Sequence, residues 1–118
     1  LINELPAGYR IFLIGAPTDK ELADGILTGS SNKNVQNLCG KLNFLQSAAL
    51  MQQAVMNYTN DSAPLHFATA MNAPVTAVFC STVPAFGFGP LRDNARLVEI
   101  TERLACRPCG LHGHRAHA

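Results

Sequence analysis

The sequence has almost no excess of charge of either sign. Nine Lys and Arg residues are balanced by eight Asp and Glu residues, so the formal net charge is +1. The charges of both signs are scattered along the 118 residues. Binding to a nucleic-acid backbone or to an anionic membrane surface typically relies on a basic cluster. We therefore expect no nucleic-acid partner and no polybasic membrane patch.

Long apolar runs are missing as well. No stretch approaches the roughly 18 consecutive apolar residues that indicate a membrane-spanning helix. The first ten residues, LINELPAGYR, contain an acid and a proline and lack the basic start of a signal peptide. Because the chain begins at Leu1, with LINELP similar to the end of a helix before a strand, we expect a fragment of a longer protein.

The four cysteines lack the pattern of a disulfide scaffold. Cys39 and Cys80 are isolated in apolar stretches, where a free thiol packs like a small hydrophobic residue. Cys106 and Cys109 form a close pair in the Cys- and His-rich tail, residues 103–118. This usage indicates a reducing compartment more than a secreted protein.

What the sequence does contain is an alternation of short apolar and amphipathic segments, and 47% of its residues are hydrophobic. We expect one domain over residues 1–118 with one core. The strand-like segments are residues 9–14, 35–38, 55–59, 75–80 and 97–100, and the helical ones are residues 19–27, 44–54 and 63–71. Apolar strands that alternate with helices predict an α/β fold with a parallel sheet covered on both faces. We expect Phe44, Met51, Phe67 and Met71 in its core.

The most informative segment is residues 55–71, VMNYTNDSAPLHFATAM, which reads as strand, tight turn and helix. Asp61 or Ser62 can cap the helix, and Pro64 is tolerated in the first turn because its missing N–H is unpaired there anyway. The open N–H groups of such a helix start favour an anion. His66 follows Ser62 by four residues, so both side chains can face one ligand. This pattern predicts a phosphate site.

Four stretches resemble the carboxyl-terminal domain of the lipopolysaccharide heptosyltransferases, glycosyltransferase family 9, which has the GT-B fold. They are IFLIGAPTDKELADGI, NLCGKLNFLQSAALMQQA, TNDSAPLHFATAMNAPVTAVF and STVPAFGFGP, in this order. The most specific piece, TNDSAPLH, is similar to the T-N-D-[ST]-G-x-x-H of the family. The resemblance covers residues 9–108.

The resemblance implies a Rossmann-like parallel sheet that lacks its first strand. It also implies an inverting glycosyltransferase that moves a heptose from ADP-heptose to the lipopolysaccharide core, without a metal cofactor. The family acts in the cytoplasm at the inner membrane, so the resemblance implies a cytoplasmic protein, peripheral to that membrane at most.

The resemblance also implies site residues. Asp61 would contact the sugar hydroxyls or the surroundings of the phosphates. Ser62 and the backbone of Ala63 would meet the diphosphate, and His66 would donate a hydrogen bond to a phosphate oxygen. Lys41 falls where the family often has Lys or Arg.

The sequence departs from the family pattern at three places. Ala63 replaces the usual glycine, GKLNF replaces G-K-T-S-L, and Leu45 with Gln46 beside it stands where an acidic residue typically holds the ribose. The first strand of the domain, a phosphate-binding lysine and the acceptor domain with the catalytic base would precede Leu1. We therefore expect no catalytic residue in this chain, no transfer by the chain alone, and marginal stability or pairing with another chain.

Two other functions stay open from the residues alone. One is a nucleotide- or anion-binding module without chemistry. The other is an interaction domain stabilised by a metal in the tail, where thiolate and imidazole ligands of the kind that zinc takes are close together. The candidate ligands are Cys106, Cys109, His112 and His114. The alternative for the cysteines is a loop in which they pack or stay reduced, and we predict no metal site. Hydrolase chemistry by Ser62 and His66 is not expected, because no G-x-S-x-G turn surrounds the serine.

Overall fold

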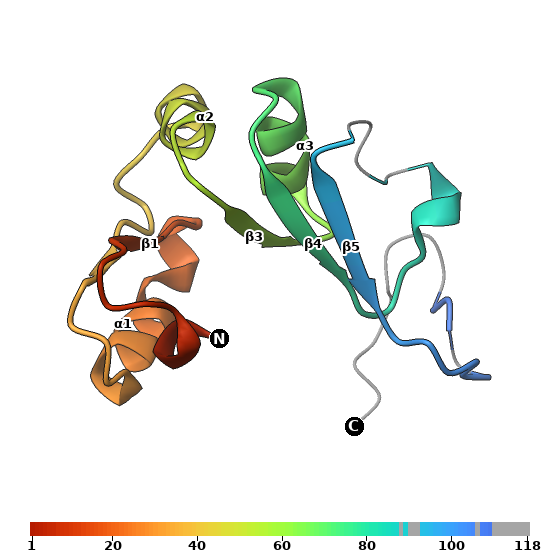
Figure 1. Cartoon of the computed structure of the whole chain (residues 1–118), viewed down its shortest axis with the longest axis horizontal. Helices are drawn as coiled ribbons and strands as arrows, with labels where there is room; N and C mark the ends of the chain where they lie inside the picture. Colours follow the sequence, from red (N-terminus) through yellow and green to blue (C-terminus); the bar gives the residue numbers. More distant parts are fainter. Residues whose placement is uncertain (88, 90–92, 106, 110–118) are drawn as a thin grey trace. The chain divides into compact units, whose positions relative to one another are not determined.

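The computed structural model describes residues 1–87, 89, 93–105 and 107–109. Two compact units are distinguished in it, Leu1–Ser47 and Ala48–Ala118. Helices and strands alternate in both units, and every strand pair among the described residues is parallel (Figure 1). The predicted α/β class with parallel strands is therefore confirmed.

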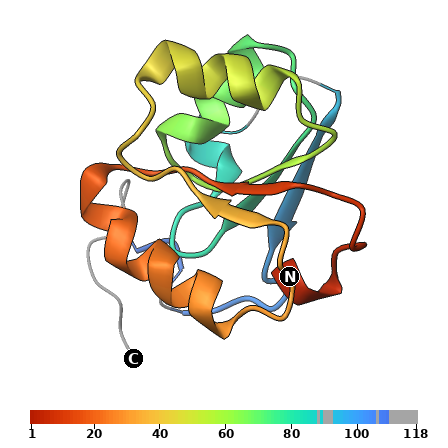
Figure 2. The same cartoon turned by 90° about the vertical axis from the view of Figure 1, so that its left-hand side faces the viewer.

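The first unit contains a two-stranded ladder and one α-helix. Its elements are the 3-10 helix η1 (Ile2–Glu4), β1 (Ile11–Leu13), the 3-10 helix η2 (Pro17–Asp19), α1 (Lys20–Gly29) and β2 (Val35–Asn37). Ile11 pairs with Val35 in the parallel ladder of β1 and β2, and α1 lies alongside β2 (Figure 2). The buried apolar side chains of this unit are small: Ala23, Val35 and Cys39. Leu22 is 70% exposed, although the helical spacing placed it on the apolar face with Ala23.

A glycine fixes the turn that follows β2. Gly40 has a φ of 72°, and its N–H donates to the carbonyl of Gly15 at 2.9 Å. A Cβ atom at this position would lie 2.9 Å from the Cα of Pro17, closer than real Cβ contacts. Gly40 is therefore required both by its left-handed backbone and by the close approach of the loop after β1.

The helix α2 (Phe44–Gln52) begins in the first unit with a reciprocal cap. The N–H of Asn43 donates to Oε1 of Gln46, and the N–H of Gln46 donates to Oδ1 of Asn43. This arrangement is a capping box, which pairs two N–H groups that the helix start leaves open. Phe44 follows directly in the first turn and is 75% exposed, so its predicted place in the core is wrong.

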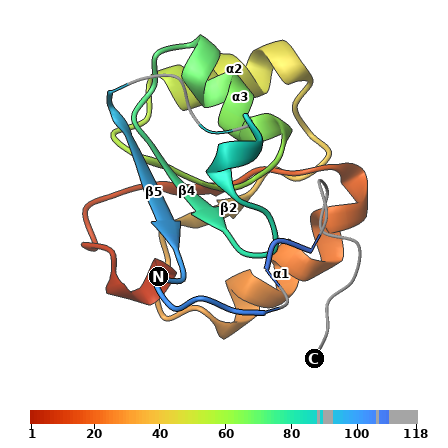
Figure 3. The ribbon, with the colours of Figure 1, turned by 90° about the vertical axis from the view of Figure 1, so that its right-hand side faces the viewer.

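The second unit contains a three-stranded ladder. Its elements after α2 are β3 (Asn57–Asn60), α3 (Ala63–Ala70), β4 (Val75–Phe79), the 3-10 helix η3 (Pro84–Phe86) and β5 (Ala95–Glu99). The strand order is β3-β4-β5, with β4 in the middle (Figure 1). Figure 3 shows β4 beside β5.

The core of the second unit lies between α3 and the ladder. Val75, Ala77 and Phe79 alternate along β4 and are buried, while Leu65 and Ala68 of α3 are fully covered. Met51 is buried as predicted, and Phe67 and Met71 are partly buried. Burial of a large apolar side chain contributes about 1.5–3 kcal/mol. The middle strand and α3 are therefore the best-anchored elements of this unit.

The end of α3 is closed by a left-handed residue. Asn72 has a φ of 53°, the N–H of Ala73 donates to the carbonyl of Ala68, and the N–H of Asn72 donates to that of Thr69. These two bonds form a Schellman motif, in which asparagine is the usual substitute for glycine. The motif directs the chain from α3 into β4.

The two isolated cysteines differ in burial. Cys39 is 4% exposed, as predicted for a packed thiol, whereas Cys80 directly after β4 is exposed, so its predicted burial is wrong. The helices formed by the described residues are too short or too polar to cross a membrane.

Candidate functional site

The candidate site lies where β3 passes into α3. Asp61 and Ser62 connect the two elements, at the carboxyl end of a strand in a parallel ladder. Ligands of open α/β sheets bind outside the carboxyl ends of the strands. The strand–turn–helix predicted from the sequence is therefore present, with the strand starting two residues later than expected.

Ser62 occupies the N-cap position of α3 but does not cap it with its side chain. Its φ is −158°, and its hydroxyl donates to Oδ1 of Asn60 at 2.6 Å. Asp61 does not cap the helix either, because its Oδ2 accepts the hydroxyl of Thr82 at 2.6 Å. The position of the helix start was predicted correctly, but the predicted side-chain cap is wrong.

The missing cap leaves the start of α3 open. Pro64 has no N–H, and the N–H of Leu65 donates to the carbonyl of Ser62. The N–H of Ala63, the first helical residue, has no acceptor among the residues that the structure describes. A helix start of this kind carries partial positive charge and can receive one anionic oxygen.

The predicted residues around this helix start differ in exposure. Asp61 and Ser62 are partly buried, whereas Ala63 and His66 are exposed. His66 lies one turn into α3, so its imidazole is accessible to a ligand at the helix start. These four residues belong to the second unit, and together they provide a carboxylate, a backbone N–H and an imidazole.

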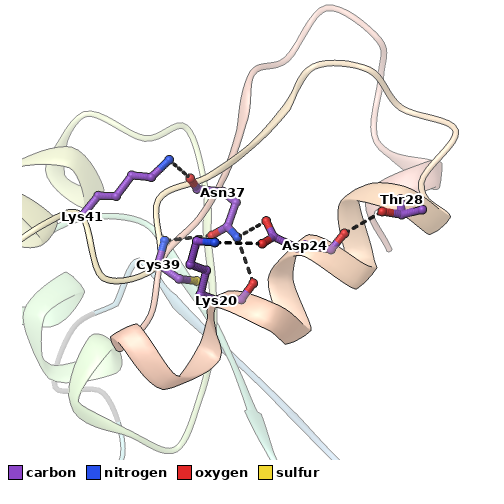
Figure 4. Close-up of polar contacts among 6 residues, drawn as sticks. All are labelled: Lys20, Asp24, Thr28, Asn37, Cys39 and Lys41. Carbon is purple, nitrogen blue, oxygen red and sulfur yellow. Dashed lines mark hydrogen bonds and ion pairs between the residues drawn. The ribbon is translucent and has the colours of Figure 1, made fainter.

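Lys41, the fifth predicted residue, belongs to the first unit. It is exposed, and its Nζ donates to the carbonyl of Asn37, the last residue of β2, at 2.9 Å (Figure 4). The side chain of Asn37 organises the same region: its Nδ2 donates to Oδ1 of Asp24 and to the carbonyl of Lys20, and its Oδ1 accepts the N–H of Cys39. Lys41 thus caps the end of β2 in this structure.

Two groups in this polar cluster have shifted pKa values. The hydrogen bond from Asn37 lowers the pKa of Asp24, and Lys20 and Lys41 add to the effect. Burial raises the pKa of the Cys39 thiol, and the carboxylates of Asp19 and Asp24 act in the same direction. Cys39 is therefore a protonated packing residue at neutral pH, not a reactive thiolate.

The position expected to hold a ribose carries no carboxylate. Leu45 is 82% exposed, and the side chain of Gln46 is occupied by the capping box of α2. The amide oxygen of Gln46 accepts the N–H of Asn43, so a ribose hydroxyl would compete with the helix cap for it. Helix capping thus accounts for the side chain of Gln46, while nothing in the structure explains Leu45.

Sequence reasoning missed two residues beside the site, Thr82 and Arg107. The hydroxyl of Thr82 donates to Asp61, and Nη2 of Arg107 donates to the carbonyl of Thr82 at 2.9 Å. Thr82 lies outside the predicted strands and helices, and Arg107 lies between the paired cysteines Cys106 and Cys109. The only signal for Thr82 was a small polar residue shortly after a buried strand, at the edge where ligands bind.

The tail was considered for a metal site, and its described part makes other contacts. The N–H of Cys109 donates to the carbonyl of Ser81 at 2.9 Å. No group of three or more His, Cys, Asp or Glu side chains that could hold a metal occurs in the described ranges. Three of the candidate ligands, Cys106, His112 and His114, lie outside the described residues.

Comparison with known proteins gives the family. Residues 3–113 match glycosyltransferase family 9 (heptosyltransferase). This match extends over nearly the whole chain, and the chain therefore belongs to this family, in agreement with the resemblance of its motifs.

Relatives and solved structures agree with the family. Lipopolysaccharide heptosyltransferase 3 of Escherichia coli K12 is 37% identical over 89 residues, which are 74% of this chain and 26% of the relative. Lipopolysaccharide heptosyltransferase 2 of Salmonella typhimurium LT2 is 31% identical over 103 residues, 85% of this chain and 28% of the relative. A structure of E. coli ADP-heptose lipopolysaccharide heptosyltransferase II is 31% identical with a TM-score of 0.71, over 77% of this chain and 28% of the other. The chain spans about a quarter of the length of the relatives it matches.

Proposed function

We propose that this chain is part of an inverting glycosyltransferase and forms its nucleotide-sugar-binding region. The donor is an ADP-heptose-like nucleotide sugar, and the acceptor is the lipopolysaccharide core. Family membership and the names of the relatives support this function. The observation that carries it is the uncapped start of α3, where the N–H of Ala63 and the imidazole of His66 accompany the carboxylate of Asp61.

Each of these groups suits a different part of the nucleotide-sugar donor. The N–H of Ala63 and His66 suit phosphate oxygens, because one is a donor at a positive helix end and the other a donor on the exposed first turn. Asp61 is an acceptor when ionised, so it suits the hydroxyl groups of the sugar and not the phosphates. Ser62 contributes its backbone to the turn that holds both. Lys41 of the first unit is a further candidate for the phosphates.

Transfer by inversion needs a base that deprotonates the acceptor hydroxyl, and we assign no catalytic residue in this chain. The leaving ADP gains negative charge as the bond to the sugar breaks. Fixed donors at a helix start stabilise such charge without reorganisation, so we propose transfer without a metal cofactor. We propose that transfer takes place in the cytoplasm, at the inner membrane, with peripheral association at most.

Donor binding by the whole protein tests this function. Isothermal titration with ADP and with ADP-heptose should give saturable binding to both. The variant Asp61→Ala should bind ADP-heptose about 10- to 100-fold more weakly, the loss expected for a hydrogen bond to a charged group. It should change the affinity for ADP much less, since ADP lacks the heptose hydroxyls.

The matched control is Asp93→Ala, which removes an equally charged, exposed carboxylate from the segment before β5. Its affinities should equal those of the wild type. If neither ligand binds, or if Asp61→Ala binds ADP-heptose as tightly as Asp93→Ala does, the proposed function is refuted. Transfer that stops when the protein is treated with a chelator would refute the metal-independent part alone.

A further inference from the structure

A chain of hydrogen bonds joins the carboxyl ends of the three strands in the second unit. Asp61 follows β3, Thr82 follows β4, and Glu99 is the last residue of β5. Thr82 donates to Asp61, and Arg107 binds both Thr82 and Glu99. Residues far apart in the sequence are thereby held at the edge of the ladder where the candidate site lies.

The contact between Thr82 and Asp61 is short and protected from water. Oγ1 of Thr82 donates to Oδ2 of Asp61 at 2.6 Å, and Thr82 is only 7% exposed. A hydroxyl that donates to a carboxylate forms a charge-assisted hydrogen bond, which is stronger than a bond between neutral groups. The described residues provide no donor to the second oxygen, Oδ1, which is therefore left for a ligand hydroxyl.

Arg107 holds the backbone of Thr82 in place. Its Nη2 donates to the carbonyl of Thr82 at 2.9 Å and to Oε2 of Glu99 at 2.6 Å. The Arg107 side chain is 10% exposed, whereas that of Glu99 is 41% exposed. The bond to Thr82 is therefore partly buried, and the bond to Glu99 lies at the surface. The N–H of Cys109 donates to the carbonyl of Ser81 and fixes the same segment one residue earlier.

Asp61 needs such an anchor because an alternative partner is near in the sequence. A carboxylate beside an uncapped helix start is attracted to the open N–H groups and commonly caps them. If Asp61 turned to the N–H of Ala63, it would fill the place of a phosphate oxygen with its own negative charge. The hydroxyl of Thr82, after β4, offers Oδ2 a different donor.

We propose that Thr82, itself held by Arg107, is a positioning residue that orients Asp61 toward the sugar hydroxyls of the donor and keeps the start of α3 open for its diphosphate. This role rests on the proposed function and deepens it. Thr82 touches no donor atom in this account and acts through Asp61. Its contribution is preorganisation, which raises affinity by removing the cost of arranging the carboxylate at the moment of binding.

The test is a double-mutant cycle on donor affinity in the whole protein. Thr82→Val removes the hydroxyl at nearly constant volume and should weaken ADP-heptose binding about two- to tenfold, as expected for one net hydrogen bond. Thr82→Ser keeps the hydroxyl and should restore the affinity. In the Asp61→Ala background, Thr82→Val should have no further effect, because the carboxylate it orients is gone.

The matched control is Thr76→Val in β4, whose hydroxyl donates to the sulfur of Met56 and not to the site. It should leave donor affinity unchanged. Arg107→Gln provides a second variant if Thr82→Val does not fold, and its smaller loss of affinity should also vanish in Asp61→Ala. Thermal unfolding of each variant separates affinity from stability.

Each outcome bears on the role of Thr82. Three results together support it. Thr82→Val binds ADP-heptose more weakly than the wild type, Thr82→Ser binds it as tightly as the wild type, and Thr82→Val has no further effect in the Asp61→Ala background. If Thr82→Val lowers the melting temperature but binds ADP-heptose like the wild type, the role of Thr82 is overturned. The proposed function stays intact in that case as long as Asp61→Ala binds ADP-heptose more weakly than the wild type. A wild type that binds neither ADP nor ADP-heptose overturns both proposals.

Discussion

The two units differ in what holds them together. Eleven apolar residues are buried among those the structure describes; three lie in residues 1–47 and eight in the second unit. The three in the first unit are Ala23, Val35 and Cys39, so none of its large side chains is fully buried. Polar contacts are prominent there instead, with Asn37 bound to three neighbouring groups (Figure 4).

A precisely positioned site requires the more rigid of the two units. Leu65, in the first turn of α3, is fully covered. Asp61, just before this helix, accepts the hydroxyl of Thr82, and the carbonyl of Thr82 accepts a bond from Arg107. Lys41, in the first unit, extends from an exposed turn held mainly by hydrogen bonds. We therefore expect donor geometry to be set in the second unit and the first unit to open at lower cost.

The largest effect should come from the same substitution made in each unit. Leu65→Ala removes a side chain that is 0% exposed and should lower the free energy of unfolding by about 2–5 kcal/mol. Leu45→Ala in α2 removes one that is 82% exposed and should change it by less than about 0.5 kcal/mol. Urea unfolding measures the free energy of unfolding of both variants. Equal losses of this free energy would contradict the expected difference.

A smaller effect should separate two glycines of the first unit. Gly40→Ala should cost about 1–3 kcal/mol, because its φ is 72° and the new Cβ would meet Pro17. Gly25→Ala in α1 meets nothing within 4 Å and should stabilise the protein by about 0.5–1 kcal/mol. If thermal unfolding shows that Gly40→Ala is as stable as the wild type, the turn after β2 does not require glycine.

The smallest effect concerns the polar cluster and pH. Asp24 has a lowered pKa in the folded protein, chiefly because Asn37 donates to it. It therefore stabilises the fold above its unfolded pKa, and this contribution is lost as the pH falls through its folded pKa. Asn37→Ala should raise the pKa of Asp24, as measured by NMR titration of its carboxyl. An unchanged pKa would show that the two lysines, and not Asn37, cause the shift.

The elements of the fold were predictable from local patterns. The five strand segments and three helices were located by apolar runs and helical spacing, and most boundaries differ by one to two residues. Phe44 was misplaced because spacing alone does not reveal that the first turn of α2 is exposed. Cys80 was misplaced because β4 ends one residue before it, at Phe79.

The site was predictable only in its local part. Asp61, Ser62 and His66 are close in sequence, so the motif contains them. The bonds from Thr82 and Arg107 to this region join residues that are 21 and 25 positions apart, and no local pattern encodes such contacts. For the same reason, the sequence suggested Asp61 as a helix cap, and only the partner after β4 shows why it is not one.

The proposed function requires that an ADP-sugar binds at the start of α3. Its most direct test is an NMR titration of the whole protein with ADP-heptose, followed at the backbone amides. The amide of Ala63 should shift most strongly in the second unit, together with that of His66, and Asp61→Ala should reduce these shifts at equal ligand concentration. Saturable binding that leaves the amides of Ala63 and His66 unmoved would contradict it.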